Sequence, residues 1–106
     1  MARALINVPA TARKDEIIAI KALIQHPMET GYRHTTSGAV IGRDIITRFV
    51  CTYDGEVVFA ADFFPAVAAN PFIAFTTVAT RSGVISFSWS GDQRFAQIET
   101  AKITVT

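Results

Sequence analysis

The residues whose types could support chemistry gather between positions 26 and 34, with a single thiol further along the chain. His26, Met28, Glu29 and His34 lie within this short stretch, and Cys51 is the only cysteine. Two histidines, a thiolate and a weak methionine ligand form copper centres, whereas two histidines and a carboxylate can bind zinc or iron. One hypothesis is therefore a small metal-binding β-sandwich, of the copper or superoxide-reductase kind, that uses His26 and His34.

The spacing of these residues favours a polar connection over a metal site. His26-Pro27-Met28 directs successive side chains differently, which suits a bend, and nothing in the sequence brings Cys51 to this stretch. We therefore favour a loop with solvated His and Glu side chains. A Cys-His nucleophile is also disfavoured, because it needs an exposed, activated thiolate and free cysteine is usually buried. With no convincing alternative catalytic set, we expect no catalytic site, no cofactor and no bound metal.

The elements that must position these residues are predicted to form one domain over residues 1–106. Half of the residues are hydrophobic and 18% are charged, so the chain can bury a sizeable core. The net charge of +1 is not concentrated in any block, which disfavours nucleic acid as a partner. No run approaches the ~18 apolar residues that would span a bilayer. A lone cysteine also excludes an intrachain disulfide.

Most of the chain is predicted to be short strands separated by turns. Asp54-Gly55 lies between two strand-like runs and predicts a hairpin, because a type I′ turn needs positive φ at both positions. Residues 15–25 fit a helical stripe or a strand rich in isoleucine, and periodicity alone does not decide between them. About seven short strands predict an all-β, immunoglobulin-like antiparallel β-sandwich. An α+β domain with a helix at 15–25 is the alternative.

The segment 63–75 is predicted to contribute to a partner-binding face. Phe63, Phe64, Phe72 and Phe75 surround two prolines there, in a small domain that already holds eight Phe, one Trp and two Tyr. Some of these rings must fill the core, but surplus aromatic residues are enriched at protein interfaces.

Three long pieces of the chain resemble the SoxZ family of bacterial thiosulfate oxidation. They read IKALIQHPMETGYR, FVCTYDGEVVFAADFFPAVAANPFIAF and SGVISFSWSGD. The most specific motifs are two. One is His26-Pro27-Met28-Glu29 with Gly31 and Arg33, and the other is Ala69-Asn70-Pro71 with Ile73-Ala74-Phe75. The resemblance covers nearly the whole chain and implies an immunoglobulin-like sandwich, so it also implies a strand at 15–25.

The resemblance further implies a non-catalytic subunit of a SoxYZ-type carrier complex. Such a subunit binds SoxY, whose C-terminal cysteine carries sulfur intermediates, in a heterodimer or a heterotetramer. It also implies transient contacts with other Sox enzymes and a periplasmic location, reached by co-export with a twin-arginine partner because no signal peptide is recognised here. The candidate partner-binding residues are His26, Pro27, Met28, Glu29, Gly31, Arg33, Phe63, Phe64, Asn70, Pro71 and Phe72.

Overall fold

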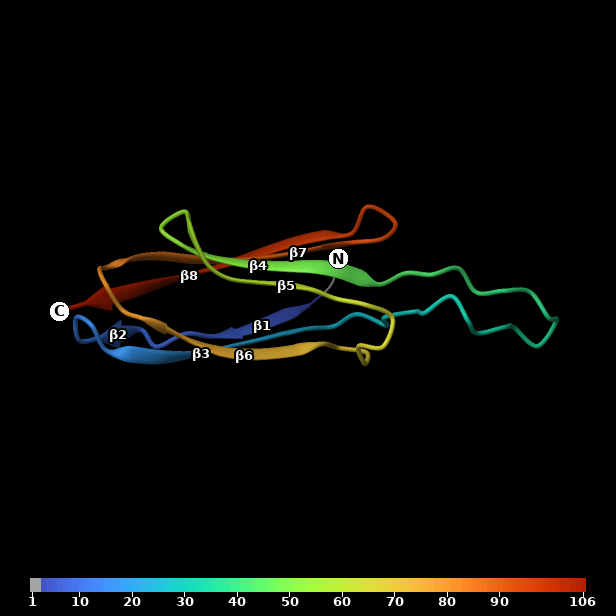
Figure 1. The fold of residues 1–106 in the computed structure, drawn as a ribbon, viewed down its shortest axis with the longest axis horizontal. Coiled ribbons are helices and arrows are strands. Elements are labelled where there is room, and N and C mark those ends of the chain that lie inside the picture. Colours follow the sequence, from blue (N-terminus) through green and yellow to red (C-terminus); the bar gives the residue numbers. More distant parts are fainter. Residues whose placement is uncertain (1–2) are drawn as a thin grey trace.

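The computed structural model describes residues 3–106, which form eight strands in two facing sheets (Figure 1). The strands are β1 (Ala4–Asn7), β2 (Thr11–Ala12), β3 (Ile17–Ile24), β4 (Ile46–Tyr53), β5 (Glu56–Asp62), β6 (Phe72–Val78), β7 (Gly83–Gly91) and β8 (Ala96–Val105). One sheet has the order β1-β3-β6 and the other β2-β8-β7-β4-β5. All pairings are antiparallel except the short one between β2 and β8. The predicted all-β, immunoglobulin-like sandwich is confirmed.

The ambiguous segment 15–25 contains strand β3, so the helix alternative was wrong. Ile18, Ile20, Ala22 and Ile24 alternate with residues that are more exposed. This period of two places one apolar row in the core. The backbone hydrogen bonds of the strand are made to β1 on one side and to β6 on the other. The β-branched side chains suit this pleated surface, and the helical spacing of residues 17, 20, 23 and 24 was a coincidence.

The Asp54-Gly55 hairpin is confirmed. Its two central residues have φ values of 50° and 83°, as a type I′ turn requires, and they connect β4 to β5. The Asp54 carboxylate accepts a hydrogen bond from the Val84 N–H at 2.8 Å, which ties this turn to the neighbouring strand β7.

An aromatic cluster fills the space between the sheets. Phe49 on β4 contacts Trp89 and Phe87 on β7, with ring centroids 5.3 and 6.3 Å apart, and all three are almost completely buried. Phe59 and Phe75 extend the cluster from β5 and β6, one strand from each sheet. The core therefore runs from the middle of the sandwich to the side where these two strands lie.

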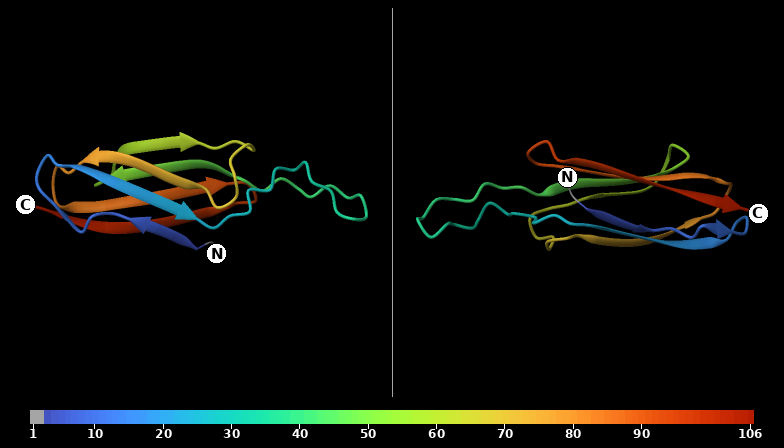
Figure 2. Two further views of the ribbon diagram at one scale, coloured as in Figure 1. Left: turned by 90° about the horizontal axis from the view of Figure 1, so that it is seen from below. Right: turned by 180° about the vertical axis from the view of Figure 1, so that it is seen from behind.

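The two sides of the sandwich are closed differently (Figure 2). On one side the chain passes from β1 in the first sheet to β2 in the second, so residues 8–10 connect the sheets. On the other side β5 and β6 are the edge strands of their sheets. We call this second side, formed by Val58, Phe59, Ala61, Ile73 and Phe75, the open side.

The connection between β3 and β4, residues 25–45, projects from one end of the sandwich as a long arm (Figure 1). It gives the molecule extents of 60 × 20 × 19 Å. Isolated bridges join Glu29 to Asp44 and His34 to Val40, so the arm is a loosely paired hairpin. Residues 3–106 contain no helix that is long and apolar enough to cross a membrane.

Candidate partner-binding surface

Two segments that are 44 positions apart meet at the base of the arm. The Asn70 side-chain Oδ1 accepts a hydrogen bond from the His26 N–H at 2.9 Å. The Asn70 N–H in turn donates to the His26 carbonyl oxygen at 2.8 Å. Asn70 adopts a left-handed conformation with φ of 52°, which asparagine tolerates better than most residues. The structure thus brings together the two sequence motifs on which the resemblance rested.

The His26 side chain is buried at this junction. We expected a solvated loop residue there, and that expectation was wrong. His26 is 5% exposed, and its Nδ1 accepts a hydrogen bond from the Met28 N–H at 3.0 Å. Its Nε2 lies 3.6 Å from Asp44 Oδ1, and its ring meets Phe95 edge-on at 4.9 Å. Because Nδ1 is an acceptor, the neutral ring carries its proton on Nε2, facing Asp44.

Met28 anchors the arm from inside. It is 4% exposed, and its sulfur accepts a hydrogen bond from the Ile46 N–H at 3.3 Å, where β4 begins. Its φ of 50° is unusual for this residue type, so the surrounding contacts must fix the bend after Pro27. Met28 is therefore a packing residue and not an available metal ligand.

Two ion pairs brace the arm from outside. Arg33 donates to Glu29 through Nε at 3.0 Å, and this hydrogen bond lowers the pKa of the Glu29 carboxyl. Arg43 donates to Asp92 at 2.8 Å, which lowers the pKa of Asp92 in the same way. Gly31 has a φ of 88°, and a Cβ there would lie 3.1 Å from the Cβ of Arg43, so a side chain would disturb this bracing.

The structure does not assemble the metal site of the alternative hypothesis. Residues 3–106 contain no group of three or more His, Cys, Asp or Glu side chains placed to hold a metal ion. His26 is buried at the base of the arm, whereas His34 is exposed further along it. The donor set that suggested a copper, zinc or iron centre is therefore divided between different surroundings.

Cys51 lies in the middle of β4 and is completely buried. Burial raises the pKa of its thiol to about 11. A thiol of this kind is protonated near neutral pH and is inaccessible to a substrate, because the thiolate is the reactive form. Cys51 is thus a small apolar core residue, as the sequence suggested.

The segment between β5 and β6 carries both buried and exposed aromatic residues. Phe63 and Pro71 are buried, while Phe64 and Phe72 are 65% and 59% exposed. Phe64 belongs to the connection at the arm end, and Phe72 begins β6 on the outer face of the three-stranded sheet. Of the three candidate partner-binding phenylalanines Phe63, Phe64 and Phe72, the last two therefore expose most of their surface in the isolated chain.

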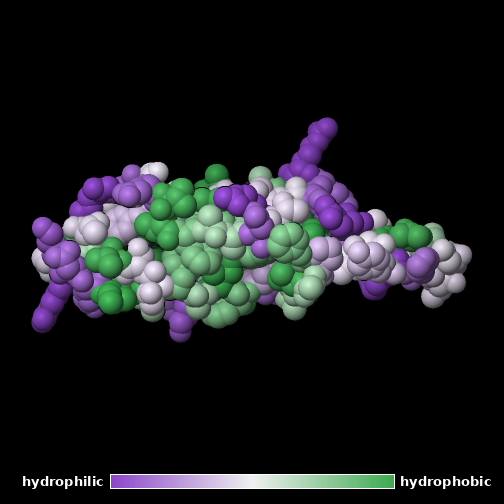
Figure 3. All heavy atoms as spheres, viewed as in Figure 1, coloured by the Kyte–Doolittle hydropathy of each residue, from purple (hydrophilic) through white to green (hydrophobic). Residues whose placement is uncertain are grey.

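The open side carries a further apolar surface, of which the sequence analysis named Phe75 but not the residues of β5 (Figure 3). The rings of Phe59 and Phe75 stack there, with centroids 4.5 Å apart and planes 9° apart, although neither ring is fully buried. Val58 has no partner in the register between β4 and β5, where pairing shifts from Cys51–Phe59 to Thr52–Val57. This β-bulge leaves both Val58 and Phe59 half-buried, instead of one inward and one outward.

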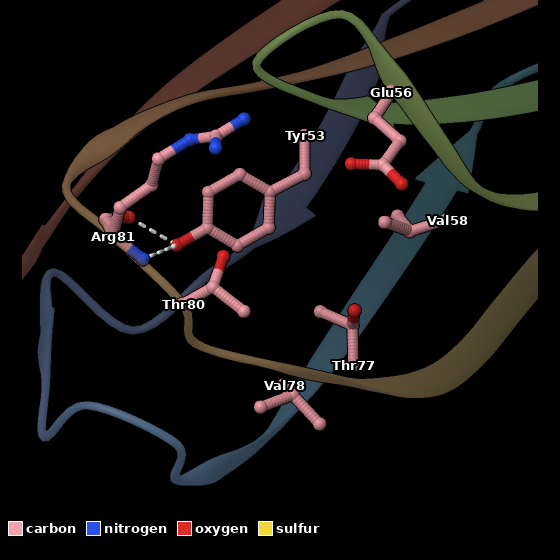
Figure 4. Close-up of a pocket in the computed structure, with 7 residues that line it drawn as sticks. All are labelled: Tyr53, Glu56, Val58, Thr77, Val78, Thr80 and Arg81. Atoms are coloured by element: carbon pink, nitrogen blue, oxygen red, sulfur yellow. Dashed lines mark hydrogen bonds between the residues drawn. The ribbon is translucent and has the colours of Figure 1, made fainter.

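A pocket of about 290 Å³ opens at the end of this side that lies away from the arm (Figure 4). Glu56 and Val58 reach it from β5, and Thr77 and Val78 from β6. Tyr53 forms its floor, and its hydroxyl donates to the Arg81 carbonyl oxygen and accepts from the Arg81 N–H. The pocket shows that side chains of the two sheets do not close over one another here.

One signal in the sequence could have indicated the open side. The run VVFAA at 57–61 has no charged residue, although an edge strand usually carries charges or proline that prevent association. Without the strand order, however, nothing identified this run as an edge.

The fold is shared with proteins of different function. A superoxide reductase (neelaredoxin) from Ignicoccus hospitalis superposes with a TM-score of 0.69 at 16% identity, covering 97% of this chain and 80% of that one. The sulfur carrier protein SoxY from Chlorobium limicola f. thiosulfatophilum superposes with a TM-score of 0.66 at 11% identity, covering 97% and 78%. At such identities the likeness concerns the fold alone. No curated protein matches the sequence.

The fold and the buried thiol together define a small β-sandwich whose distinctive surfaces are an arm and an open, apolar side. A family model described as "Sulphur oxidation protein SoxZ" matches residues 6–102. The chain therefore belongs to the SoxZ family.

Proposed function

We propose that this chain is the non-catalytic subunit of a SoxYZ-type carrier complex in thiosulfate oxidation. In this role it binds and supports a SoxY-type subunit, whose C-terminal cysteine carries the sulfur intermediates. Membership of the SoxZ family supports the proposal. The observation that carries it is the state of Cys51, the only thiol, which is buried in β4 with a pKa of about 11.

A carrier thiol must enter the active sites of several enzymes, so it needs an exposed position on a flexible segment. Cys51 has neither property, because it is fixed in a strand between two paired neighbours, β5 and β7. The carrier thiol of the complex therefore belongs to another polypeptide. The solved SoxY protein has the same fold as this chain, so we picture the complex as two related sandwiches packed together.

Co-expression with a SoxY-type subunit tests this function. We expect a stable complex that survives gel filtration at micromolar concentration, and we expect Cys51→Ser to leave thiosulfate-dependent turnover of a reconstituted Sox system largely unchanged. Two purified subunits that do not associate would refute the proposal. Lost turnover in a Cys51→Ser variant that still folds and still binds its partner would instead give the thiol a chemical role.

The arm is proposed as a second contact surface, used transiently by other Sox enzymes. Its exposed side chains include Tyr32, at 77% exposure, and Val40, at 61%. Replacement of residues 33–41 by a short turn should leave pairing with SoxY intact, because these residues lie beyond the buried base of the arm. The same variant should lower turnover in the reconstituted system. Unchanged turnover would remove the arm from the proposal.

The periplasm is the proposed location, with export alongside the SoxY-type partner. Cell fractionation in the presence and absence of that partner tests it. A chain that stays in the cytoplasm in both cases would contradict this part of the proposal alone.

A further inference from the structure

We propose that the open side of the sandwich is the surface on which the SoxY-type subunit packs, through an uncharged edge of its own β-sandwich. This inference rests on the function proposed above and adds the surface that performs it. The contact is centred on the stacked rings of Phe59 and Phe75 and extends to Val58, Ala61 and Ile73.

The backbone of the open side can pair with an edge strand of another chain. Within residues 3–106, β5 pairs only with β4 and β6 pairs only with β3, so each presents one free edge. Exposed edges invite pairing with another chain, and soluble proteins protect them with charges, proline or bulges. The bulge at Val58 offers partial protection of β5, and β6 has no bulge. A β-sandwich partner has the edge strands that match this geometry.

The charge distribution points to an apolar occupant. Residues 57–61 and 72–80 contain no charged side chain. Charges appear only towards the two ends of this side. Glu56 and Arg81 border the pocket, where Arg81 pairs with Asp54 at 2.9 Å, and Asp62 pairs with Arg48 at 2.6 Å at the other end. A nucleic acid or an acidic segment would find no positive charge at the centre of this side, and Arg81 and Arg48 at its ends are already paired with carboxylates. An uncharged strand edge would bury apolar surface without leaving an unpaired ion in the interface.

The open side supplies a large part of the area that a stable pairing needs. The strand β5 has seven residues, which corresponds to about 23 Å of extended chain. The sandwich is 19–20 Å across, so the side presents a projected area of about 450 Å² before side-chain relief is counted. This is somewhat more than half of the roughly 800 Å² that each partner contributes to a standard interface, and the relief of the side chains and the exposed ring of Phe64 add to it.

The outer faces of the two sheets fit a partner less well. On the three-stranded sheet, Leu5, Leu23 and Phe72 form one apolar row, but Asn7 and Lys21 form the next. On the five-stranded sheet, the exposed Ile98 lies opposite Ser88 and is followed by Thr100 and Lys102 along β8. Each outer face thus carries a lysine among its apolar residues, whereas residues 57–61 and 72–80 carry no charged side chain.

Four lysine substitutions test the assignment, one at a time, with binding to the SoxY-type subunit measured by calorimetry. Val58→Lys and Thr77→Lys each place a charge on the open side, one on each edge strand. Both positions are only half-buried, so a long lysine stem can reach solvent in the free chain. Ile17→Lys and Ile98→Lys are the matched controls on the two outer faces, at 71% and 65% exposure. Thermal unfolding of each free chain establishes that it is folded.

Both open-side variants should bind at least about 100-fold more weakly than the unmodified chain, because a charge would be buried without a partner. The two controls should bind within about threefold of it. If the unmodified chain itself does not bind, the proposed function fails. If it binds and folded Val58→Lys and Thr77→Lys bind equally well, or if only a control loses binding, the function stands and this surface is wrong. A dimer of this chain alone that Val58→Lys dissociates, while binding to the SoxY-type subunit is unaffected, would also overturn the assignment.

Discussion

Asn70 and His26 are joined by two hydrogen bonds across the base of the arm. The His26 N–H donates to the Asn70 side chain at 2.9 Å, and the Asn70 N–H donates to the His26 carbonyl oxygen at 2.8 Å. This pair joins the start of the arm to the turn that leads into β6. The arm therefore has a defined base, although few bonds hold its outer part. Substitution of Asn70 tests how much this junction contributes.

Asn70→Ala should lower the free energy of unfolding by about 2 kcal/mol, because it removes the acceptor for the His26 N–H and places alanine at positive φ. Asn70→Gly removes the same acceptor without the φ penalty and should cost about 1 kcal/mol. Urea unfolding of both variants separates the two contributions. An Asn70→Ala variant as stable as the unmodified protein would show that the junction does not contribute to stability.

His26→Phe should destabilise the protein by about 2 kcal/mol, because it leaves the buried Met28 N–H without its acceptor while it keeps an aromatic ring beside Phe95. His26→Asn retains an acceptor near the position of Nδ1 and should recover part of the loss. The exposed His34 is the control, and His34→Ala should change stability by less than about 0.5 kcal/mol. Equal effects of His26→Phe and His34→Ala would contradict the structural role of His26.

The Arg43–Asp92 pair predicts a pH dependence. The hydrogen bond from Arg43 lowers the pKa of Asp92 below its ordinary value of 3.8. The pair therefore stabilises the folded protein fully at pH values above 3.8, the pKa of the unfolded state. This contribution is lost as the pH falls through the lower pKa of Asp92 in the folded state. Arg43→Gln should raise the pKa of Asp92, as measured by NMR titration of the carboxyl carbon, and should weaken this acid dependence. Arg94→Gln is the control, because no ion pair of Arg94 within 4 Å is found in residues 3–106. An unchanged Asp92 titration in Arg43→Gln would contradict the pairing.

The Cys51 thiol should not react with a thiol reagent in the native protein. With a pKa of about 11, the thiolate fraction at pH 8 is only about one in a thousand, and burial further blocks access. Labelling with an aromatic disulfide reagent should therefore require unfolding and should become rapid in concentrated denaturant. Fast stoichiometric labelling of the folded chain would show that the thiol is accessible, and would reopen a chemical role for it.

Much of the fold was visible in local sequence patterns. The β-branched and aromatic runs located most of the strands, and Asp54-Gly55 located one hairpin with its turn type. These features depend on neighbours along the chain, such as the period of two in Ile18, Ile20 and Ala22 or the positive φ of a two-residue turn. The same patterns left residues 15–25 undecided, because the spacing of four apolar residues satisfied both periods.

The candidate site was predicted less completely, since it depends on which distant segments meet. The sequence by itself determined most of the strands, the single thiol and the diagnostic motifs around His26 and Asn70. Only the tertiary structure decided that His26 is buried, that Asn70 binds it, and that β5 and β6 end their sheets on the same side. Strand order sets these relationships, and strand order follows from packing two sheets around a shared core, which no local pattern of residues specifies.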